Sequence, residues 1–342
     1  MNPPQVPYAD STAEPLEALL AQAFEARRSF FDPAHEGAVR LFNGFLEGCP
    51  DLAVDLYAAT AVLHDYSDPA GGGAARIAAA VEVLRGRFPW LRAGVLKRRS
   101  AASSAGRRGE VIFGTTLDRQ VREHGVWYAV DLCMNRDASL YLDTRSLRRW
   151  ALENLSGAAV LNAFAYTGSL GVAALAGGAR HVVQLDRSRR FLDLAEASCR
   201  LNGFTVSAEE LLVKDFFPGV AVLKRQEARF DCVFLDPPFF STTPAGTVNL
   251  GGGSARLINK VRPLVADGGR LVAVNNALFV RGRDYLGALE ALCADGYLEI
   301  ERLVPVPDDF TGYPATVRGA PVTDPAPFNH STKIAVLRVR RK

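Results

Sequence analysis

The chain has 342 residues and a formal net charge of +3, with 48% hydrophobic and 23% charged residues. These proportions are typical of soluble globular proteins and argue against a disordered or membrane-embedded chain, since no apolar run reaches the roughly 18 residues that a spanning helix needs. The length predicts two domains, and an N-terminus without a basic and apolar leader predicts a cytoplasmic protein.

The N-terminal part of the chain mixes helical and strand-like patterns. Residues 14–30 repeat apolar positions at helical spacing, so we expect an amphipathic helix within a helical segment that covers residues 1–36. Residues 37–145 contain short β-rich runs and one helical stretch, ARIAAAVEVLRGRF. This mixture predicts a small α/β domain.

A basic segment interrupts this small domain. The sequence KRRSAASSAGRRGE is rich in serine and glycine and has no hydrophobic periodicity, which predicts a flexible, positively charged loop. Its cationic residues are Lys97, Arg98, Arg99, Arg107 and Arg108. A second basic cluster at the C-terminus consists of Arg338, Arg340, Arg341 and Lys342.

From residue 146 onward, β-rich runs alternate with helical patterns, which is typical of βαβ units and a parallel sheet. The last two β-rich runs, LEIERLVPV and TKIAVLRV, have no helix between them and therefore suit an antiparallel pair at one sheet edge. We predict that residues 146–342 form a Rossmann-like, doubly wound α/β domain with antiparallel edge strands.

Acidic residues end three of the predicted parallel strands, namely Asp186 after HVVQL, Asp215 after ELLVK and Asp236 after DCVFL. Ligands of open parallel sheets bind at the carboxyl ends of the strands, where a carboxylate can accept hydrogen bonds from ribose hydroxyls or an adenine amine. Each aspartate alone could be a helix cap, but three in register indicate a nucleoside site.

A turn of small residues, Asn162 to Gly168, follows the first of these strands. Its glycine and alanines would let the backbone approach a ligand closely before the next helix begins. The turn lacks the GxGxxG spacing of dinucleotide-binding proteins, and this weakens the case for a hydride-transfer enzyme.

Several segments resemble a known family. Residues 161–204, LNAFAYTGSLGVAALAGGARHVVQLDRSRRFLDLAEASCRLNGF, and then DCVFLDPPFFS are similar to the class I methyltransferase core of bacterial 23S ribosomal RNA methyltransferases, both the cytosine-C5 and the guanine-N7 members. The resemblance continues upstream in HGVWYAVDLCMNRDASLYLDTRSLRRW, expected to be a β-hairpin and an LDxR element, and more weakly in LFNGFLEGCPDLAVDLY. It implies the class I methyltransferase fold for the C-terminal domain and recognition of RNA or substrate by the smaller domain.

The resemblance also implies that S-adenosylmethionine binds at the strand ends and leaves as S-adenosylhomocysteine. Asp143 and Arg145 of the LDTR element would face the methionine end, where they complement an ammonium and a carboxylate; a surface ion pair is the alternative. The expected cofactor contacts are Asp143, Arg145, Asn162, Phe164, Ala165, Tyr166, Thr167, Gly168, Asp186, Arg187, Ser188, Asp215, Phe216 and Asp236.

The residues after the fifth parallel strand bear on the methyl acceptor. Cytosine C5 usually needs activation by a cysteine thiolate, whereas guanine N7 has a free lone pair and needs mainly orientation. The cytosine-C5 members have a cysteine here, but in this chain RLVAV is followed by Asn275 and Asn276, as in the guanine-N7 members. Asparagine amides can pair with a guanine edge. The residues expected at the reaction are Asp236, Pro237, Pro238, Phe239, Asn275 and Asn276.

The five cysteines offer no obvious replacement for that thiol. They form no Cys-x-x-Cys pair, and with few histidines in the chain we expect reduced, mostly buried thiols and no metal site. Cys232 falls inside a predicted strand, Cys199 and Cys293 inside predicted helices, and Cys133 in the upstream hairpin segment; Cys49 lies in the small domain.

Contacts with RNA are expected around the DPP turn. Phe239 and Phe240 follow this turn, where a ring could stack on a base swung out of its helix, although a core position is equally expected. The segment STTPAGTVNLGGGSAR, residues 241–256, predicts a mobile loop over the entrance or, alternatively, an inert linker. Lys97, Arg98, Arg99, Arg107 and Arg108 would contact phosphates, or would form only a solvated face.

The favoured interpretation is therefore methylation of guanine N7 in 23S ribosomal RNA, either free or in an assembly intermediate. Three other functions stay open: a cytosine-C5 ribosomal RNA methyltransferase, a small-molecule or protein methyltransferase, and a non-catalytic RNA-binding relative that keeps the nucleoside pocket.

Overall fold

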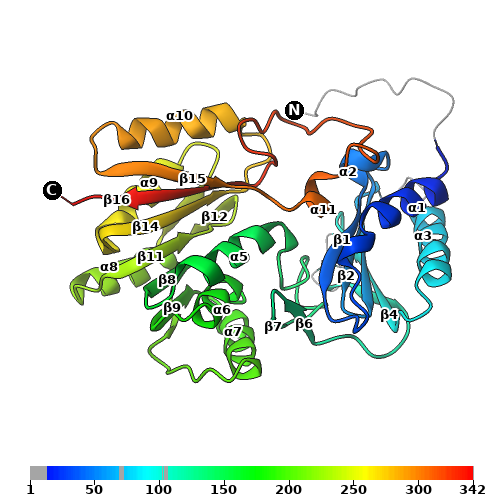
Figure 1. Ribbon diagram of the computed structural model, residues 1–342, viewed down its shortest axis with the longest axis horizontal. Helices are drawn as coiled ribbons and strands as arrows, with labels where there is room; N and C mark the ends of the chain where they lie inside the picture. The colour runs from blue at the N-terminus through cyan, green and yellow to red at the C-terminus, as the bar shows by residue number, and fades with distance from the viewer. Residues whose placement is uncertain (1–13, 69–72, 102, 104–106, 342) are drawn as a thin grey trace.

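Two sheets of different make-up organise the chain (Figure 1). The computed structural model describes residues 14–68, 73–101, 103 and 107–341. None of the described helices has the length and apolar character that a membrane crossing requires. Within the same residues, no group of His, Cys, Asp or Glu is placed to hold a metal ion.

The N-terminal sheet has five strands in sequence order. Its strands are β1 (Ala38–Asn43), β2 (Leu52–Tyr57), β3 (Thr60–Asp65), β4 (Ala93–Arg98) and β5 (Glu110–Phe113). Neighbouring strands are antiparallel except for β3 and β4, which are parallel and joined by helix α3. The small α/β domain predicted from the sequence has this structure.

Helices cover the outer face of this sheet. Helix α1 (Leu16–Ala26) and helix α3 (Gly73–Arg87) pack together there, and a short 3-10 turn (Arg28–Phe30) follows α1. Leu20 and Phe24 of α1 are buried against strand residues such as Leu63. The described part of the predicted helical segment, residues 14–36, is therefore part of the N-terminal domain, and residues 1–13 lie outside the described residues.

The inner face of the N-terminal sheet is polar. Alternate strand residues point there, including Arg40, Asp55, Tyr57, His64 and Lys97, because successive side chains of a strand point to opposite faces. The Arg40 guanidinium pairs with the Asp55 carboxylate at 2.7 Å, and His64 Nε2 lies 3.0 Å from the other Asp55 oxygen. This face looks toward the C-terminal domain.

A β-hairpin connects the two domains. It consists of β6 (Gln120–Glu123) and β7 (Val126–Ala129), so only β7 lies in the segment from residue 124 onward where the sequence places a hairpin, and Cys133 follows the hairpin instead of lying in it. A 3-10 turn (Leu142–Thr144) then leads into helix α5 (Arg145–Asn154).

The second sheet has seven strands in the order β10-β9-β8-β11-β14-β16-β15. The first five are parallel, whereas β16 is antiparallel to β14 and to β15. The strands are β8 (Ala159–Ala163), β9 (His181–Asp186), β10 (Leu211–Val213), β11 (Phe230–Leu235), β14 (Val265–Asn275), β15 (Leu298–Val304) and β16 (Lys333–Val339). The predicted doubly wound sheet with antiparallel edge strands is thus confirmed.

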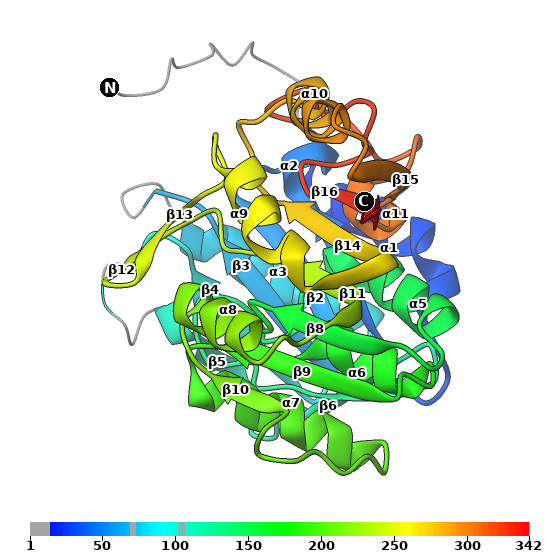
Figure 2. The same ribbon diagram turned by 90° about the vertical axis from the view of Figure 1, so that its left-hand side faces the viewer.

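Helices cover both faces of the second sheet (Figure 2). One face holds α5, α6 (Ser169–Ala176) and α7 (Arg189–Leu201), and the other holds α8 (Phe216–Arg225), α9 (Ser254–Val261) and α10 (Gly282–Cys293). A 3-10 turn (Arg262–Leu264) follows α9. Strand residues such as Val160 and Leu161 face opposite layers, so the parallel strands are apolar on both sides.

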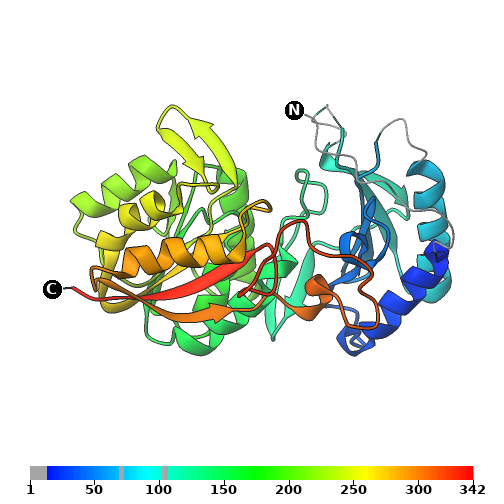
Figure 3. The same cartoon turned by 90° about the horizontal axis from the view of Figure 1, so that it is seen from above.

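The chain between β15 and β16 crosses to the N-terminal domain. Residues 305–332 carry helix α11 (Asp308–Thr311), which packs against β1 before the chain returns to β16 (Figure 3). The predicted boundary at residue 145 therefore separates the strands of the two sheets. It does not separate the two domains completely, because residues 305–332 follow the C-terminal sheet in the chain but pack in part on the N-terminal domain.

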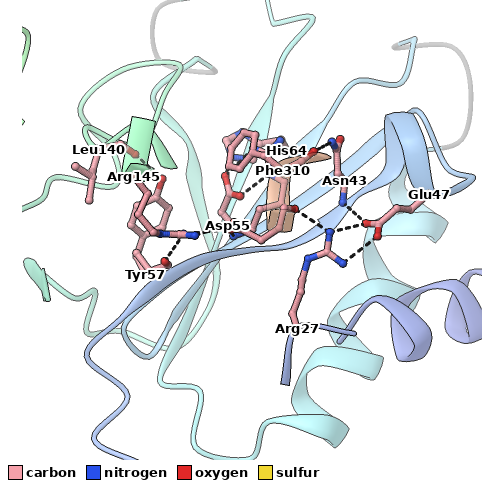
Figure 4. Close-up of polar contacts among 12 residues, drawn as sticks. Arg27, Asn43, Glu47, Asp55, Tyr57, His64, Leu140, Arg145 and Phe310 are labelled. Carbon is pink, nitrogen blue, oxygen red and sulfur yellow. Dashed lines mark hydrogen bonds and ion pairs between the residues drawn. The ribbon is translucent and has the colours of Figure 1, made fainter. Parts of the chain in front are cut away.

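A buried ionic cluster fastens the crossing segment (Figure 4). The Asp309 carboxylate, which has no solvent exposure, accepts hydrogen bonds from the Arg145 guanidinium at 2.7 Å and from the Arg40 backbone N–H at 2.9 Å. The Arg27 guanidinium donates to the Glu47 carboxylate at 2.9 Å and to the Asp309 carbonyl at 2.8 Å. The cluster joins α1, α2 (Gly44–Glu47), α5 and α11.

Removal of the central carboxylate should destabilise the fold. Asp309→Asn keeps the shape of the side chain but leaves the buried Arg145 and Arg148 with a single shared carboxylate, Glu123, so we expect the free energy of unfolding to fall by about 3–5 kcal/mol in urea denaturation. Glu153→Gln breaks an exposed pair with Arg149 on α5 and should change stability by less than about 1 kcal/mol. Equal stabilities of the two variants would contradict this role for Asp309.

Candidate active site

The carboxyl ends of the parallel strands open on a cavity of about 560 Å³. This volume lies within the usual range of roughly 300–1,000 Å³ for small-molecule sites. Most of the residues predicted for the cofactor and the reaction line it. These are Asp143, Asn162, Phe164, Ala165, Tyr166, Asp186, Arg187, Asp215, Phe216, Asp236, Pro237, Pro238, Phe239 and Asn276.

Three of the predicted cofactor residues lie behind the cavity wall and support it. Thr167 Oγ1 donates to the Ser139 carbonyl, and Ser188 caps the N-terminus of α7. Gly168 has a φ of +76°, and a side chain there would begin 2.4 Å from Ala195 Cβ. Its conformation and the space around it both require glycine.

Of the two residues expected at the methionine end, Asp143 lines the cavity and Arg145 does not, and the alternative of a surface ion pair between them is not found either. The Arg145 guanidinium points into the ionic cluster, where it binds Asp309, Glu123 and the Ala38 carbonyl, and Arg145 does not line the cavity. A buried carboxylate competes successfully for this arginine because both charges would otherwise be buried without a partner.

Asn275 also differs from expectation. Its side-chain amide is buried, donates to the Leu250 carbonyl at 3.2 Å and to Ser254 Oγ at 3.1 Å, and accepts from the Ala277 N–H. Only Asn276 of the asparagine pair faces the cavity. Asn275 therefore shapes the turn that presents Asn276.

The turn after β8 has an unusual backbone. Phe164 and Tyr166 have φ values of +58° and +52°, a region that costs side-chain-bearing residues of order 1–3 kcal/mol each. Such conformations persist only where the surrounding structure fixes them, and they concentrate at functional sites. Here the Asp186 carboxylate fixes the turn by accepting a hydrogen bond from the Tyr166 N–H at 2.9 Å.

The geometry around Asp186 suits a ribose. One carboxylate oxygen accepts from Tyr166 N–H and the other from Ser188 N–H, both at 2.9 Å, so each oxygen keeps a lone pair for a further donor. Burial raises the pKa of Asp186, although these two hydrogen bonds oppose the shift.

Asp215 and two phenylalanines form the neighbouring wall. Asp215 caps α8 by accepting from Phe217 N–H at 3.2 Å, so the helix-cap alternative holds for this residue, and its carboxylate still lines the cavity. The rings of Phe164 and Phe216 stack with centroids 4.5 Å apart. They supply an apolar, planar surface next to the two carboxylates.

A second pair of carboxylates lies at the end of β11. Burial first, and then the negative charge of Asp143, raises the pKa of Asp236 to about 7. Asp143 accepts a hydrogen bond from Thr332 Oγ1 at 2.8 Å, and no donor among the described residues hydrogen-bonds the Asp236 carboxylate. Two neighbouring carboxylates with so few donors favour a ligand that carries positive charge.

The N-terminal domain completes the cavity through the segment 131–141. Tyr57 Oη donates to the Leu140 carbonyl, and Lys97 Nζ donates to the Asn135 carbonyl, both at 2.8 Å. Asn135 and Tyr141 of this segment line the cavity opposite the strand ends. The N-terminal sheet thus holds one wall of a site whose other walls belong to the C-terminal domain.

Lys97 is therefore not placed for the predicted phosphate contact. Its side chain is buried, its ammonium also donates to the Arg108 carbonyl, and burial lowers its pKa to about 8. Arg98 is exposed but pairs with Glu110 at 2.6 Å, and Arg99 binds the Arg136 carbonyl and Asp137. Arg107 and Arg108 are exposed.

The C-terminal basic cluster is far from the cavity. Since β16 is antiparallel to its neighbour β14, its last residues lie at the opposite end of the sheet from the strand ends that line the site. Arg338 pairs with Glu301 and Arg340 with Glu299, while Lys342 lies outside the described residues.

The predicted mobile loop after the DPP turn is a β-hairpin instead. Strands β12 (Phe240–Thr243) and β13 (Gly246–Asn249) pair in antiparallel fashion, and the hairpin projects from the domain (Figure 3). Ser241, Thr243 and Val248 line the cavity. The two-residue turn is Pro244–Ala245, which is not one of the glycine-containing turns typical of hairpins, so the sequence carried no clear hairpin signal here.

Other cavity residues carry no sequence signal that would have identified them. Thr332 reaches the site only because the crossing segment returns beside Asp143, and Asn135 only because Lys97 holds its backbone. The lining residues that were not predicted individually are Asn135, Tyr141, Thr144, Ser169, Leu170, Leu185, Phe191, Lys214, Phe217, Ser241, Thr243, Gly246, Val248 and Thr332; of these, Thr144 belongs to the LDTR element, and Ser241, Thr243, Gly246 and Val248 to the segment predicted over the entrance.

Comparison with known proteins identifies a family. A family model described as S-adenosylmethionine-dependent methyltransferase matches residues 77–319. The Bacillus subtilis (strain 168) protein named "Putative ribosomal RNA large subunit methyltransferase YwbD" is 27% identical over 304 residues, which are 85% of this chain and 74% of the relative. Ribosomal RNA large subunit methyltransferase I of Alteromonas mediterranea is 32% identical over 65% of this chain, and the match spans only 56% of that relative.

A solved structure supports the fold. The crystal structure of SMU.776 complexed with SAH matches 94% of this chain and 80% of that chain, with a TM-score of 0.81 and 22% sequence identity.

Loss of the Asp186 carboxylate should abolish tight cofactor binding. Asp186→Ala should weaken binding of S-adenosylhomocysteine by about 100-fold or more in titration calorimetry, since hydrogen bonds to a charged group contribute about 1.5–3 kcal/mol each. Asp193→Asn, on the exposed side of α7, should bind normally. An unchanged affinity in a folded Asp186 variant would contradict the assignment.

The raised pKa of Asp236 predicts a pH-dependent stability difference. Between about pH 4 and about pH 7 the folded protein holds this proton and the unfolded chain does not, so the contribution of Asp236 to stability falls as the pH rises. Asp236→Asn lacks this titration. The free energy of unfolding of the variant relative to wild type should therefore increase from about pH 4 to about pH 7 and then level off. A constant difference in urea denaturation across this range would contradict the raised pKa.

Proposed function

This chain belongs to the S-adenosylmethionine-dependent methyltransferase family, and we propose that it methylates a base of large-subunit ribosomal RNA, namely guanine at N7. The names of the curated relatives support the substrate class. The observation that carries the choice of base is the chemistry of the cavity, which is lined by carboxylates and an asparagine amide and, within the described residues, by no cysteine.

The residues that line the cavity complement the separate parts of the cofactor. Asp186 would accept hydrogen bonds from the two ribose hydroxyls and Asp215 one from the adenine amine, next to the phenylalanine wall of Phe164 and Phe216. Asp143 and Asp236 would face the positively charged ammonium and sulfonium groups. These charges would stabilise the Asp236 carboxylate, which has no hydrogen-bond donor among the described residues. The cofactor supplies a methyl group that is activated for displacement.

The protein's own contribution to transfer would be orientation, because in-line displacement needs the acceptor atom close to the methyl carbon and along the bond that breaks. Asn276 Nδ2 donates to the Pro237 carbonyl at 3.3 Å, which fixes the amide and leaves its oxygen for the base. The second Nδ2 hydrogen could donate to guanine O6, the acceptor next to N7.

The lack of a lining cysteine argues against the cytosine-C5 alternative. Cys232 and Cys199 are both buried in the core on the face of the sheet that α5, α6 and α7 cover, and burial raises the pKa of each thiol, so neither is a ready nucleophile. Guanine N7 needs no thiolate because its lone pair is free.

One observation favours a second acceptor atom on the same base. Guanine N7 carries no proton, whereas Asp236 lies at the reaction end of the cavity and its pKa of about 7 suits a proton acceptor. Methylation of the guanine N2 amine would use that carboxylate directly. We hold this as the alternative to N7.

Aromatic side chains at the cavity mouth suit a base that has left its helix. Phe239 is 47% exposed and lines the cavity, and the adjacent Phe240 is 58% exposed, so neither ring is a core residue. Exposed rings of this kind stack on bases of any sequence. The exposed Arg107 and Arg108 would contribute contacts with phosphates.

Mass spectrometry of nucleosides tests the proposed function. Large-subunit RNA, both free and in ribosomal particles, is incubated with the protein and S-adenosylmethionine and then digested. We expect 7-methylguanosine; N2-methylguanosine would instead support the use of Asp236 as proton acceptor. Formation of 5-methylcytidine, or of no methylated nucleoside, would contradict the proposal.

Removal of thiols should leave the reaction intact. We expect that Cys133→Ser, Cys49→Ser and Cys293→Ser, and the core changes Cys199→Ala and Cys232→Ala, keep the initial rate within about threefold where the variant is folded, because no thiol attacks the base. Two results together would favour the cytosine-C5 alternative: one folded cysteine variant loses methyl transfer, and the wild-type protein forms a covalent adduct with RNA that contains 5-fluorocytidine.

A further inference from the structure

Three residues of the N-terminal domain form an exposed aromatic and arginine cluster. Strands β1, β3 and β4 run parallel to one another, since β1 and β3 both lie antiparallel to β2 and β3 is parallel to β4. Their carboxyl ends therefore meet at one edge of the sheet. Phe45 follows β1, Tyr66 follows β3 and Arg99 follows β4, and we call these three residues the Phe45 cluster.

The cluster is a stack of planar groups. The rings of Phe45 and Tyr66 meet edge to face with centroids 4.6 Å apart, and the Arg99 guanidinium carbon lies 5.5 Å from the centre of the Tyr66 ring. Phe45 is 43% exposed although it lies on a short helix whose neighbouring residues Gly44 and Glu47 are buried. Phe45 thus keeps part of its apolar ring open to solvent.

Hydrogen bonds connect the Phe45 cluster to the cofactor cavity. Arg99 Nη1 donates to the Arg136 carbonyl at 2.8 Å and to the Asp137 carboxylate at 2.9 Å. The other Asp137 oxygen accepts from Tyr141 Oη at 2.9 Å, and the Tyr141 side chain lines the cavity. The cluster therefore continues the cavity wall outward along the N-terminal domain, on the same segment that Lys97 and Tyr57 hold.

Several arginines lie around the cluster, of which Arg98 and Arg99 are already paired with the Glu110 and Asp137 carboxylates. Arg98 precedes Arg99, the exposed Arg107 and Arg108 follow on the same strand connection, and the exposed Arg136 lies on the segment that Arg99 binds. A polyanion with planar side groups complements a surface that combines exposed rings with several guanidinium groups.

We propose that the Phe45 cluster binds a nucleobase of single-stranded RNA next to the base that is methylated. The base stacks on the outer face of Phe45, and the neighbouring arginines bind the phosphates that flank it. The proposal rests on the proposed function, because it requires RNA as substrate. It assigns the N-terminal domain a second role beyond holding the wall of the cofactor cavity.

Fluorescence anisotropy with the full chain tests this site, with a labelled oligouridylate of about ten nucleotides as probe. Phe45→Ala should weaken binding at least about fivefold, since stacking of a base on an aromatic ring contributes about 1–3 kcal/mol. Phe45→Tyr should restore the affinity. Leu201→Ala, an exposed apolar residue at the end of α7, is the matched control and should bind like wild type.

Two further readouts separate stacking from other effects. The dependence of affinity on salt between about 50 mM and 200 mM should be unchanged in Phe45→Ala, because the variant loses no phosphate contact. Its affinity for S-adenosylhomocysteine should also be unchanged, because Phe45 does not line the cavity. Equal RNA affinities of Phe45→Ala and Leu201→Ala, or no binding of the probe by wild type, would overturn the proposal.

The outcome is separable from that of the proposed function. If nucleoside analysis finds a methylated guanine and Phe45→Ala binds the probe like wild type, the function stands and the Phe45 cluster is not a base site. If no RNA is methylated but probe binding depends on Phe45, the base site stands and the proposed reaction fails.

Discussion

The arrangement of the molecule depends on one buried carboxylate. Asp309 sits on a segment that leaves the C-terminal sheet, and it binds Arg145 at the start of α5 and the backbone of β1. These partners come from different parts of the chain, and the charges are withdrawn from water, where an unpaired ion is costly. The two domains therefore have one favourable arrangement, in which every buried charge of this cluster finds its partner.

That arrangement determines the shape of the active site. The carboxyl ends of the parallel strands supply Asp186, Asp215 and Asp236, but the opposite wall comes from the segment 131–141, which the N-terminal sheet holds by hydrogen bonds to its carbonyl groups. The crossing segment adds a third contribution when it returns as Thr332 beside Asp143. The cavity is thus assembled from both domains, and a change in their relative position would open it.

The electrostatics of this cavity suit its ligand. Asp143 and Asp236 lie close enough for one charge to raise the pKa of the other carboxyl, so the pair disfavours full ionisation and favours a cation between them. A positively charged cofactor is consistent with this pair of carboxylates. The exposed ring of Phe239 also lines the cavity, and the exposed ring of Phe240 follows it in the chain.

Strong local patterns allowed the sequence by itself to determine the doubly wound domain, the three strand-end aspartates and the asparagine pair in place of a cysteine. Strand and helix periodicity is local, and parallel strands bring their carboxyl ends together whatever the details of packing. Only the tertiary structure decided which partner each charged side chain has. Arg145 binds Asp309 and does not face the cofactor site. Lys97 is a buried residue that holds the cavity wall rather than a phosphate ligand, and the Asn275 side chain points away from the cavity. The physical reason is that these outcomes depend on burial and on competing partners more than 100 residues away along the chain in the case of Arg145, which no local pattern encodes.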